Sequence, residues 1–178
     1  SAAGVDTAWQ IGTIGILTLT AAAGGDDEIG WLGGVGFEHN GHPISVFART
    51  QYASEDFAQL GTSAQSDRPK QRSFGGVGID LNHYGNLQFS YGQQTNWSSP
   101  TTETIALSHS VTLGAYGYLG FVASHTISDG SSTDLFLNWT MPFGDRRTAS
   151  VSLQHSPDAA ADEEFEVVAS MQQSLPAG

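Results

Sequence analysis

Alternation of apolar and polar side chains is the feature that most constrains the fold of this chain. In the clearest segment Leu135, Leu137 and Trp139 take one phase. Asn138 and Thr140 take the other. A period of two places the two sets on opposite faces of a β-strand. The pattern recurs in about ten segments bounded by Gly, Asn, Asp, Ser and Pro. The predicted strands are residues 7–21, 28–39, 42–53, 73–83, 86–97, 102–113, 116–127, 133–143, 147–156 and 164–174.

The connections between these segments alternate in length. Tight turns are predicted near residues 40–41, 84–85, 114–115 and 144–145, and longer loops at 22–27, 54–72, 98–101, 128–132 and 157–163. Short turns on one side and long loops on the other are typical of outer-membrane barrels. An even number of strands would put both ends of the chain on the short-turn, periplasmic side. We also expect a protease added to intact cells to cut within residues 54–72.

The polar phase separates a membrane barrel from a soluble β-sandwich, because both folds produce alternation. Charged residues make up only 13% of the chain, about half of the usual share. The polar phase carries mostly Ser, Thr, Gln, Asn and Gly, which suit a confined lumen better than an open surface. No apolar run reaches the roughly 18 residues of a membrane helix. The prediction is therefore an all-β, antiparallel transmembrane up-and-down β-barrel of about ten strands, with a soluble sandwich as the alternative.

The phases assign side chains to the two faces of this barrel. The lumen-facing candidates are Glu38, Asp80, Gln88, Ser90, Ser108, Ser110, Asn138, Thr140, Ser150, Ser152, Gln154 and Glu166. The lipid-facing candidates are Leu87, Phe89, Leu107, Val111, Leu135, Leu137 and Trp139. The inward carboxylates and the acidic loops predict a narrow wet lumen with a preference for cations.

Aromatic residues gather near the predicted strand ends, as in the two interfacial girdles of membrane barrels. Those assigned to the long-loop side are Trp31, Tyr52, Phe74, Trp97 and Phe165. Those assigned to the short-turn side are Trp9, Phe37, Tyr84, Tyr116, Tyr118 and Phe143.

No motif in the sequence indicates a catalytic, cofactor or metal site. The formal net charge of −12 argues against nucleic acid as a partner. The chain has no Cys, so thiolate nucleophiles and Cys-ligated zinc are excluded. His39 and His42 flank a turn without a specific third ligand, which favours a polar periplasmic turn over a metal site. His109 and His125 occupy apolar-phase positions, which indicates an interface or a lipid-facing irregularity.

Several segments resemble the translocation barrel of the outer-membrane ushers of chaperone–usher pilus assembly. Residues 36–41 (GFEHNG) and 45–57 (SVFARTQYASEDF) look like the usher hairpin that leads into an acidic-aromatic loop. Residues 105–114 (IALSHSVTLG) are similar to a serine-rich usher strand, and residues 135–152 (LFLNWTMPFGDRRTASVS) to a strand–Pro–x–Gly–Arg–Thr–strand hairpin. Residues 174–178 (SLPAG) look like the point where ushers continue into a further turn.

The resemblance implies a secretion pore in the bacterial outer membrane that assembles pilus subunits. Its partners would be the lipid bilayer and, within a full usher, pilus subunits or chaperone–subunit complexes. Ushers have more strands and also plug and periplasmic domains, so the chain is expected to be a fragment or a shortened form of such a barrel. The alternatives are a stand-alone small barrel acting as a passive pore or surface protein, and a soluble β-sandwich binding module.

Overall fold

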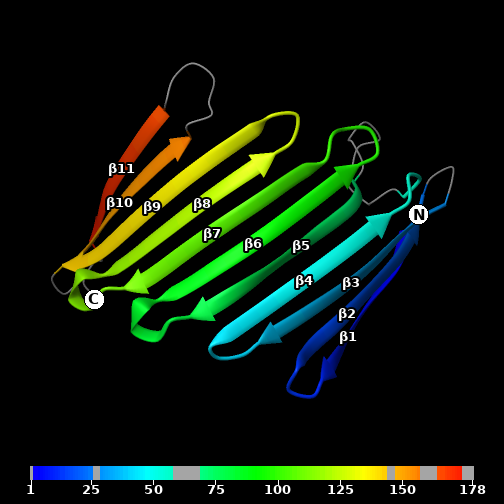
Figure 1. The fold of residues 1–178 in the computed structure, drawn as a ribbon, viewed down its shortest axis with the longest axis horizontal. Helices are drawn as coiled ribbons and strands as arrows, with labels where there is room; N and C mark the ends of the chain where they lie inside the picture. The colour runs from blue at the N-terminus through cyan, green and yellow to red at the C-terminus, as the bar shows by residue number, and fades with distance from the viewer. Residues whose placement is uncertain (1, 26–28, 58–68, 144–146, 157–163, 174–178) are drawn as a thin grey trace, which may run out of the picture. The chain divides into compact units, whose positions relative to one another are not determined.

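The fold is an antiparallel sheet of eleven strands in the order β1 to β11 (Figure 1). This computed structural model describes residues 2–25, 29–57, 69–143, 147–156 and 164–173. Each strand lies next to its neighbours in sequence, which is the up-and-down connection expected from the alternating pattern. The strands are β1 (Ala2–Ile11), β2 (Gly15–Gly24), β3 (Gly30–Asn40), β4 (Ile44–Ala53), β5 (Pro69–Asp80), β6 (Asn86–Asn96), β7 (Thr102–Thr112), β8 (Tyr118–Ile127), β9 (Ser131–Phe143), β10 (Arg147–Ser156) and β11 (Glu164–Gln173).

The prediction of one strand over residues 7–21 is wrong, because this segment contains the end of β1, a turn and most of β2. The turn closes with a hydrogen bond from Ile14 N to Ile11 O at 2.9 Å. Gly12 has φ 54° and Gly15 has φ 153°, a backbone that glycine adopts at little cost. Apolar residues continue across the turn, and they hid it from a reading based on periodicity.

An odd strand count also overturns the prediction that both chain ends lie on one side. Strands β1 and β11 run in the same direction, since neighbours in the sheet are antiparallel. The start of β1 therefore lies with the longer loops and the end of β11 with the short turns. Each of the other predicted strands coincides with one strand from β3 to β11. Most of the predicted loop at residues 54–72 lies outside the described residues, so the protease expectation stays a prediction.

The sheet is a single layer without a hydrophobic core among the residues described. Ala53 is their one buried hydrophobic residue, at 8% exposure, and no polar or charged residue is buried. A soluble sandwich buries the apolar sides of two sheets against each other, and nothing in the described sheet resembles that packing. Helical structure in the described ranges is limited to the turns Asn82–Tyr84 and Gly114–Tyr116, and no described helix is long and apolar enough to cross a membrane.

The chain divides into two compact units, which are described separately below. Unit 1 contains residues 1–77 and 90–104. Unit 2 contains residues 78–89 and 105–178.

Candidate functional site

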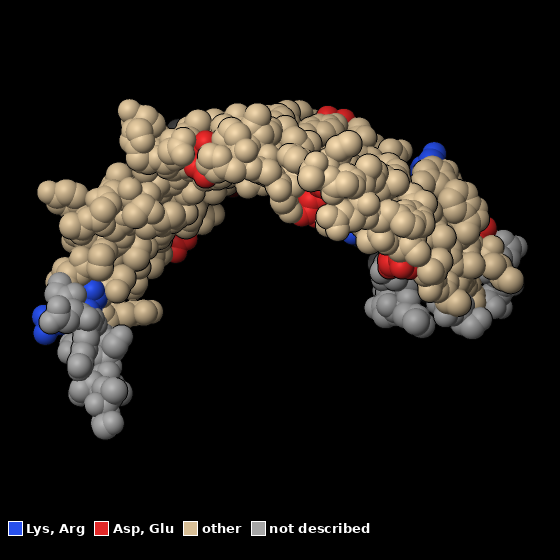
Figure 2. Space-filling view, turned by 90° about the horizontal axis from the view of Figure 1, so that it is seen from below, with Lys and Arg blue, Asp and Glu red and all other residues tan. Residues whose placement is uncertain are grey.

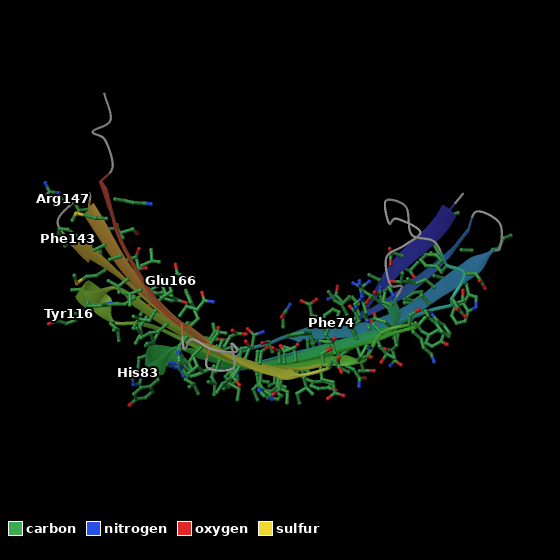
Figure 3. The ribbon with its side chains drawn as sticks, turned by 90° about the horizontal axis from the view of Figure 1, so that it is seen from above. Phe74, His83, Tyr116, Phe143, Arg147 and Glu166 are labelled. Carbon is green, nitrogen blue, oxygen red and sulfur yellow. The ribbon has the colours of Figure 1, made fainter. Side chains whose placement is uncertain are left out.

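In unit 2 the strand register gathers predicted lumen residues on one face. Residues that lie directly opposite each other in neighbouring strands share a face of the sheet. The opposed residues are Thr140 and Ser150, Asn138 and Ser152, and Gln154 and Glu166. We call this side the polar face of unit 2. Figure 3 shows Glu166 on one side of the sheet and Phe143, Tyr116 and His83 on the other.

The remaining candidates of unit 2 follow from its hairpins. The hydrogen bond from Leu81 N to Gly85 O, 2.7 Å, closes the turn between β5 and β6. Counting outward from it places Asp80 on the same face as Asn86 and, two residues further, Gln88. The equivalent bond from Leu113 N to Gly117 O, also 2.7 Å, places Ser110 opposite Gly120, which is itself opposite Asn138. Ser108 shares the phase of Ser110.

Two candidates lie in unit 1. Glu38 lies opposite Ile16 on β2 and Phe47 on β4. Ser90 lies on β6 in the same phase as Gln88. All lumen-facing candidates therefore lie in the polar phase of their strands. That these phases line water stays a prediction.

Hydroxyl, amide and carboxylate side chains form hydrogen bonds along the polar face of unit 2. The hydroxyls of Ser150 and Ser170 lie 2.8 Å apart across β10 and β11. Thr140 donates to Asn138 Oδ1 at 3.2 Å, and Ser156 donates to Asp134 Oδ1 at 2.5 Å. Among the described residues this face carries carboxylates but no Lys or Arg. It thus combines hydroxyl, amide and acidic groups with the rings of Phe136 and Tyr118, which lie opposite Gln154 and Thr140.

The opposite face of unit 2 is apolar and exposed. Leu137 lies opposite both Leu153 and Phe121, and Trp139 opposite Val151. Trp139 is 39% exposed, and no second layer covers this side among the described residues. The predicted lipid-facing residues on β9 therefore lie in a continuous apolar surface.

In unit 1 the face of Glu38 carries charged as well as neutral side chains, and we call it the polar face of unit 1. Asp6, Thr20 and Gln51 share this face through the register of β1 to β4. Thr20 donates to Asp6 Oδ1 at 2.5 Å, and Arg49 Nη2 donates to Thr20 Oγ1 at 3.3 Å. Charged residues are few in Figure 2, where Lys and Arg are blue and Asp and Glu are red.

Aromatic residues gather at the long-loop end of unit 1, on the face opposite Glu38. The ring centroids of Trp31 and Tyr52 are 5.5 Å apart, and those of Tyr52 and Trp97 are 6.5 Å apart. Lys70 Nζ lies 4.8 Å from the centroid of the Trp97 ring. Aromatic rings beside a cation at strand ends are typical of a membrane interface. Trp31, Tyr52 and Trp97, which the sequence assigned to the long-loop side, thus form one aromatic cluster in unit 1.

Two girdle assignments are wrong. Phe74 contacts Phe47, with ring centroids 6.1 Å apart, and Phe47 lies opposite Glu38 on the polar face. Tyr118 lies opposite Thr140, so it belongs to the polar face of unit 2. The sequence pattern did not reveal these two residues, because an aromatic residue is read as a member of the apolar phase wherever it occurs. The side chain of Phe165 lies outside the described residues.

Hydrogen-bonded polar residues interrupt the apolar face of unit 1, and sequence reasoning missed them. Thr50, opposite Val35, has its Oγ1 2.8 Å from Ser73 Oγ. Gln71 donates to the same Ser73 oxygen at 3.1 Å. Each of these side chains forms a hydrogen bond with another of them. This lowers the free-energy cost of placing polar groups on an apolar surface. The sequence does contain a signal for this interruption: polar residues occupy the apolar phase near the strand ends that adjoin the long loops.

A repeated hydrogen bond secures three short turns. His39 Nδ1 donates to Ile14 O at 2.6 Å, His109 Nε2 to Tyr84 O at 2.9 Å and Trp139 Nε1 to Tyr116 O at 2.9 Å. These turns have similar left-handed residues, with φ 54° at Gly12, 57° at Asn82 and 59° at Gly114. In each case the donor belongs to the strand that follows the hairpin. We call these contacts the turn latches.

The latches account for the positions of His109 and His39. His109 occupies an apolar phase because its ring reaches the carbonyl of a neighbouring turn. His39 uses one ring nitrogen in the same way, instead of standing free beside His42. Within the described ranges no group of three or more His, Cys, Asp or Glu could hold a metal ion.

Comparisons with known proteins give a likeness of fold. No family model matches the chain, and no curated protein matches it. A solved structure, described as the translocation pore of the P pilus usher PapC, superimposes with a TM-score of 0.59 and 18% identity over 88% of this chain. The chain corresponds to 36% of that chain, about a third of its length. The fold of this protein therefore resembles that of a β-barrel pore.

Proposed function

We propose that the chain forms part of a β-barrel pore in the bacterial outer membrane, with its polar faces lining an aqueous passage. One observation carries this proposal: a single-layer sheet has an exposed apolar face and an opposite face of hydroxyl, amide and charged groups. In water the apolar face would be a large unsatisfied surface. In a bilayer it would be solvated by lipid, while the polar groups keep water or one another as partners.

Strand parity bears on how the barrel closes. Membrane barrels of bacteria join antiparallel strands, and lipid-exposed sheet edges do not occur in the hydrocarbon region. Strands β1 and β11 run in the same direction, so their direct pairing would be parallel. Neither contains the Pro or Lys that protects free edges. We infer that closure takes an odd number of further strands.

The finer proposal is secretion of pilus subunits, with chaperone–subunit complexes as partners and no chemistry catalysed by this chain. It rests on the fold likeness to the PapC pore and on the usher-like segments of the sequence. Deleting the gene should abolish surface pili in electron micrographs of the source cells. Normal pili together with reduced uptake of small solutes would favour a passive pore instead.

Cysteine scanning tests the membrane arrangement, and the chain has no native Cys to remove. The substitutions Asn138→Cys and Ser152→Cys probe the polar face, while Leu137→Cys and Leu153→Cys are matched neighbours on the same strands. In outer-membrane vesicles a charged thiol reagent should label the first two, and only an apolar maleimide should label the other two. Equal labelling of all four by the charged reagent would overturn the proposal.

A further inference from the structure

The polar face of unit 1 carries two aromatic rings and two arginines side by side. Phe47 and Arg49 lie on β4, opposite Glu38 and Gly36. The ring contact between Phe47 and Phe74 places Phe74 on the same face, and Arg72 precedes Phe74 by one strand period. We call Phe47, Arg49, Arg72 and Phe74 the Arg–Phe patch.

Both guanidinium groups have spare donor capacity. Arg49 Nη2 donates to the Thr20 hydroxyl at 3.3 Å, and Arg72 Nε donates to Gln94 Oε1 at 2.9 Å. Neither arginine forms an ion pair within the described part of the chain. A guanidinium offers five N–H donors in a fork that matches a carboxylate. In a chain with 6 basic and 18 acidic residues, Arg49 reaches Asp6 only through the shared Thr20 hydroxyl, and both guanidinium groups keep donors that no described carboxylate takes.

The aromatic pair indicates a macromolecular partner. Phe74 is 46% exposed although it lies in the polar phase of its strand (labelled in Figure 3). A small inorganic anion would use the arginines but would gain nothing from the exposed Phe74 ring and the half-buried Phe47 ring beside it. Arginine together with aromatic rings is the composition enriched at protein–protein hot spots.

The backbone beside the patch leaves room for such a partner. Counting outward from the bond between Leu81 N and Gly85 O places Gly92 of β6 opposite Phe74. A Cβ atom built at Gly92 would meet nothing within 4 Å. A side chain of a docked segment could therefore reach the sheet next to the Phe74 ring.

We propose that the Arg–Phe patch docks an acidic polypeptide segment that also presents an apolar side chain. The carboxylates pair with Arg49 and Arg72, and the apolar side chain packs on Phe47 and Phe74 beside Gly92. The proposal rests on the proposed function, since it takes this face to be open to the passage. A second copy docked patch to patch fits poorly, because the arginines of the two copies would repel each other.

The test measures binding of a fluorescent peptide of alternating Asp, Glu and Phe to the whole protein in detergent, by anisotropy. The double variant Arg49→Gln/Arg72→Gln should bind it about tenfold more weakly or worse. The double variant Phe47→Ser/Phe74→Ser should also lose affinity. The matched control Arg146→Gln/Arg147→Gln removes the same charge far from the patch in the sequence and should bind as the unaltered protein does.

Several outcomes would overturn the proposal. Equal binding of the same peptide with Lys in place of its acidic residues would remove the charge argument. Full competition by inorganic phosphate, with no effect of the Phe substitutions, would reduce the patch to a simple anion site. Unchanged binding by the Arg double variant would eliminate the patch altogether. These readouts do not depend on conduction, so a protein that binds the peptide but forms no pore would contradict only the proposed function.

Discussion

The polar faces of the two units share a strand pattern but differ in chemistry. In unit 2 the described side chains on this face are joined by hydroxyl and amide bonds such as Ser150 to Ser170, with acidic groups as the only charges. In unit 1 the face adds two arginines and the contacting rings of Phe47 and Phe74, of which Phe74 is exposed. The difference teaches that alternation defines a polar surface without defining its function. A neutral or acidic face suits passage of water and ions, whereas an arginine-aromatic face suits recognition.

The largest expected effect on stability comes from introducing an arginine into unit 2. Arg placed at Leu137, on the exposed apolar face, should lower the free energy of unfolding by about 2–4 kcal/mol if the site lies near the bilayer midplane. Arg placed at Asn138, the next residue, should cost much less, because the polar face can hydrate it. Denaturant unfolding in lipid vesicles measures both. Equal costs at the two positions would contradict the assignment of faces.

A smaller effect is expected at the turn latches, which the two units have in common. Trp139→Phe and His109→Phe should each cost about 0.5–1.5 kcal/mol, since each removes one hydrogen bond to an exposed turn carbonyl that water can partly replace. His39→Phe should behave likewise in unit 1. The same unfolding measurement applies, with His83→Phe as a control whose ring stacks on Tyr84 but has no latch. A control loss as large as that of His109→Phe would mean that ring packing, and not the latch, supports the turn.

The smallest effect concerns ion selectivity. Neutralising Arg49 and Arg72 should raise the cation preference of the pore, and neutralising Asp134 and Glu166 should lower it. Each shift should be about twofold in permeability ratio, or ~0.4 kcal/mol, because exposed charges in a wet passage are screened. Reversal potentials in asymmetric salt report both changes. If both variants shifted the permeability ratio in the same direction, the proposed difference in charge between the polar faces of the two units would be contradicted.

Alternation along single strands was predictable from the sequence because it is a local property. A strand turns successive side chains to opposite faces wherever it lies, so the phases of Leu137 and Asn138 needed no knowledge of neighbouring strands. Turns with strong punctuation were equally readable, as at residues 84–85 and 114–115. The turn at Gly12 was not, since Ile11, Ile14 and Ile16 continue the apolar pattern through it. One missed turn changed the strand count and thereby the sides on which the chain ends lie.

The tertiary structure alone decided which side chains meet between strands. Phe47 and Phe74 come together only through the pairing of β4 and β5, and no spacing in the sequence encodes that contact. The same holds for the bond from His109 to Tyr84 O, which joins residues from two hairpins. Register depends on hydrogen bonds between segments distant in sequence, so the arrangement of the polar faces lies beyond what periodicity determines. The sequence by itself determined a sheet with one apolar and one polar side, and the pairing of its strands determined which side chains meet on the polar side.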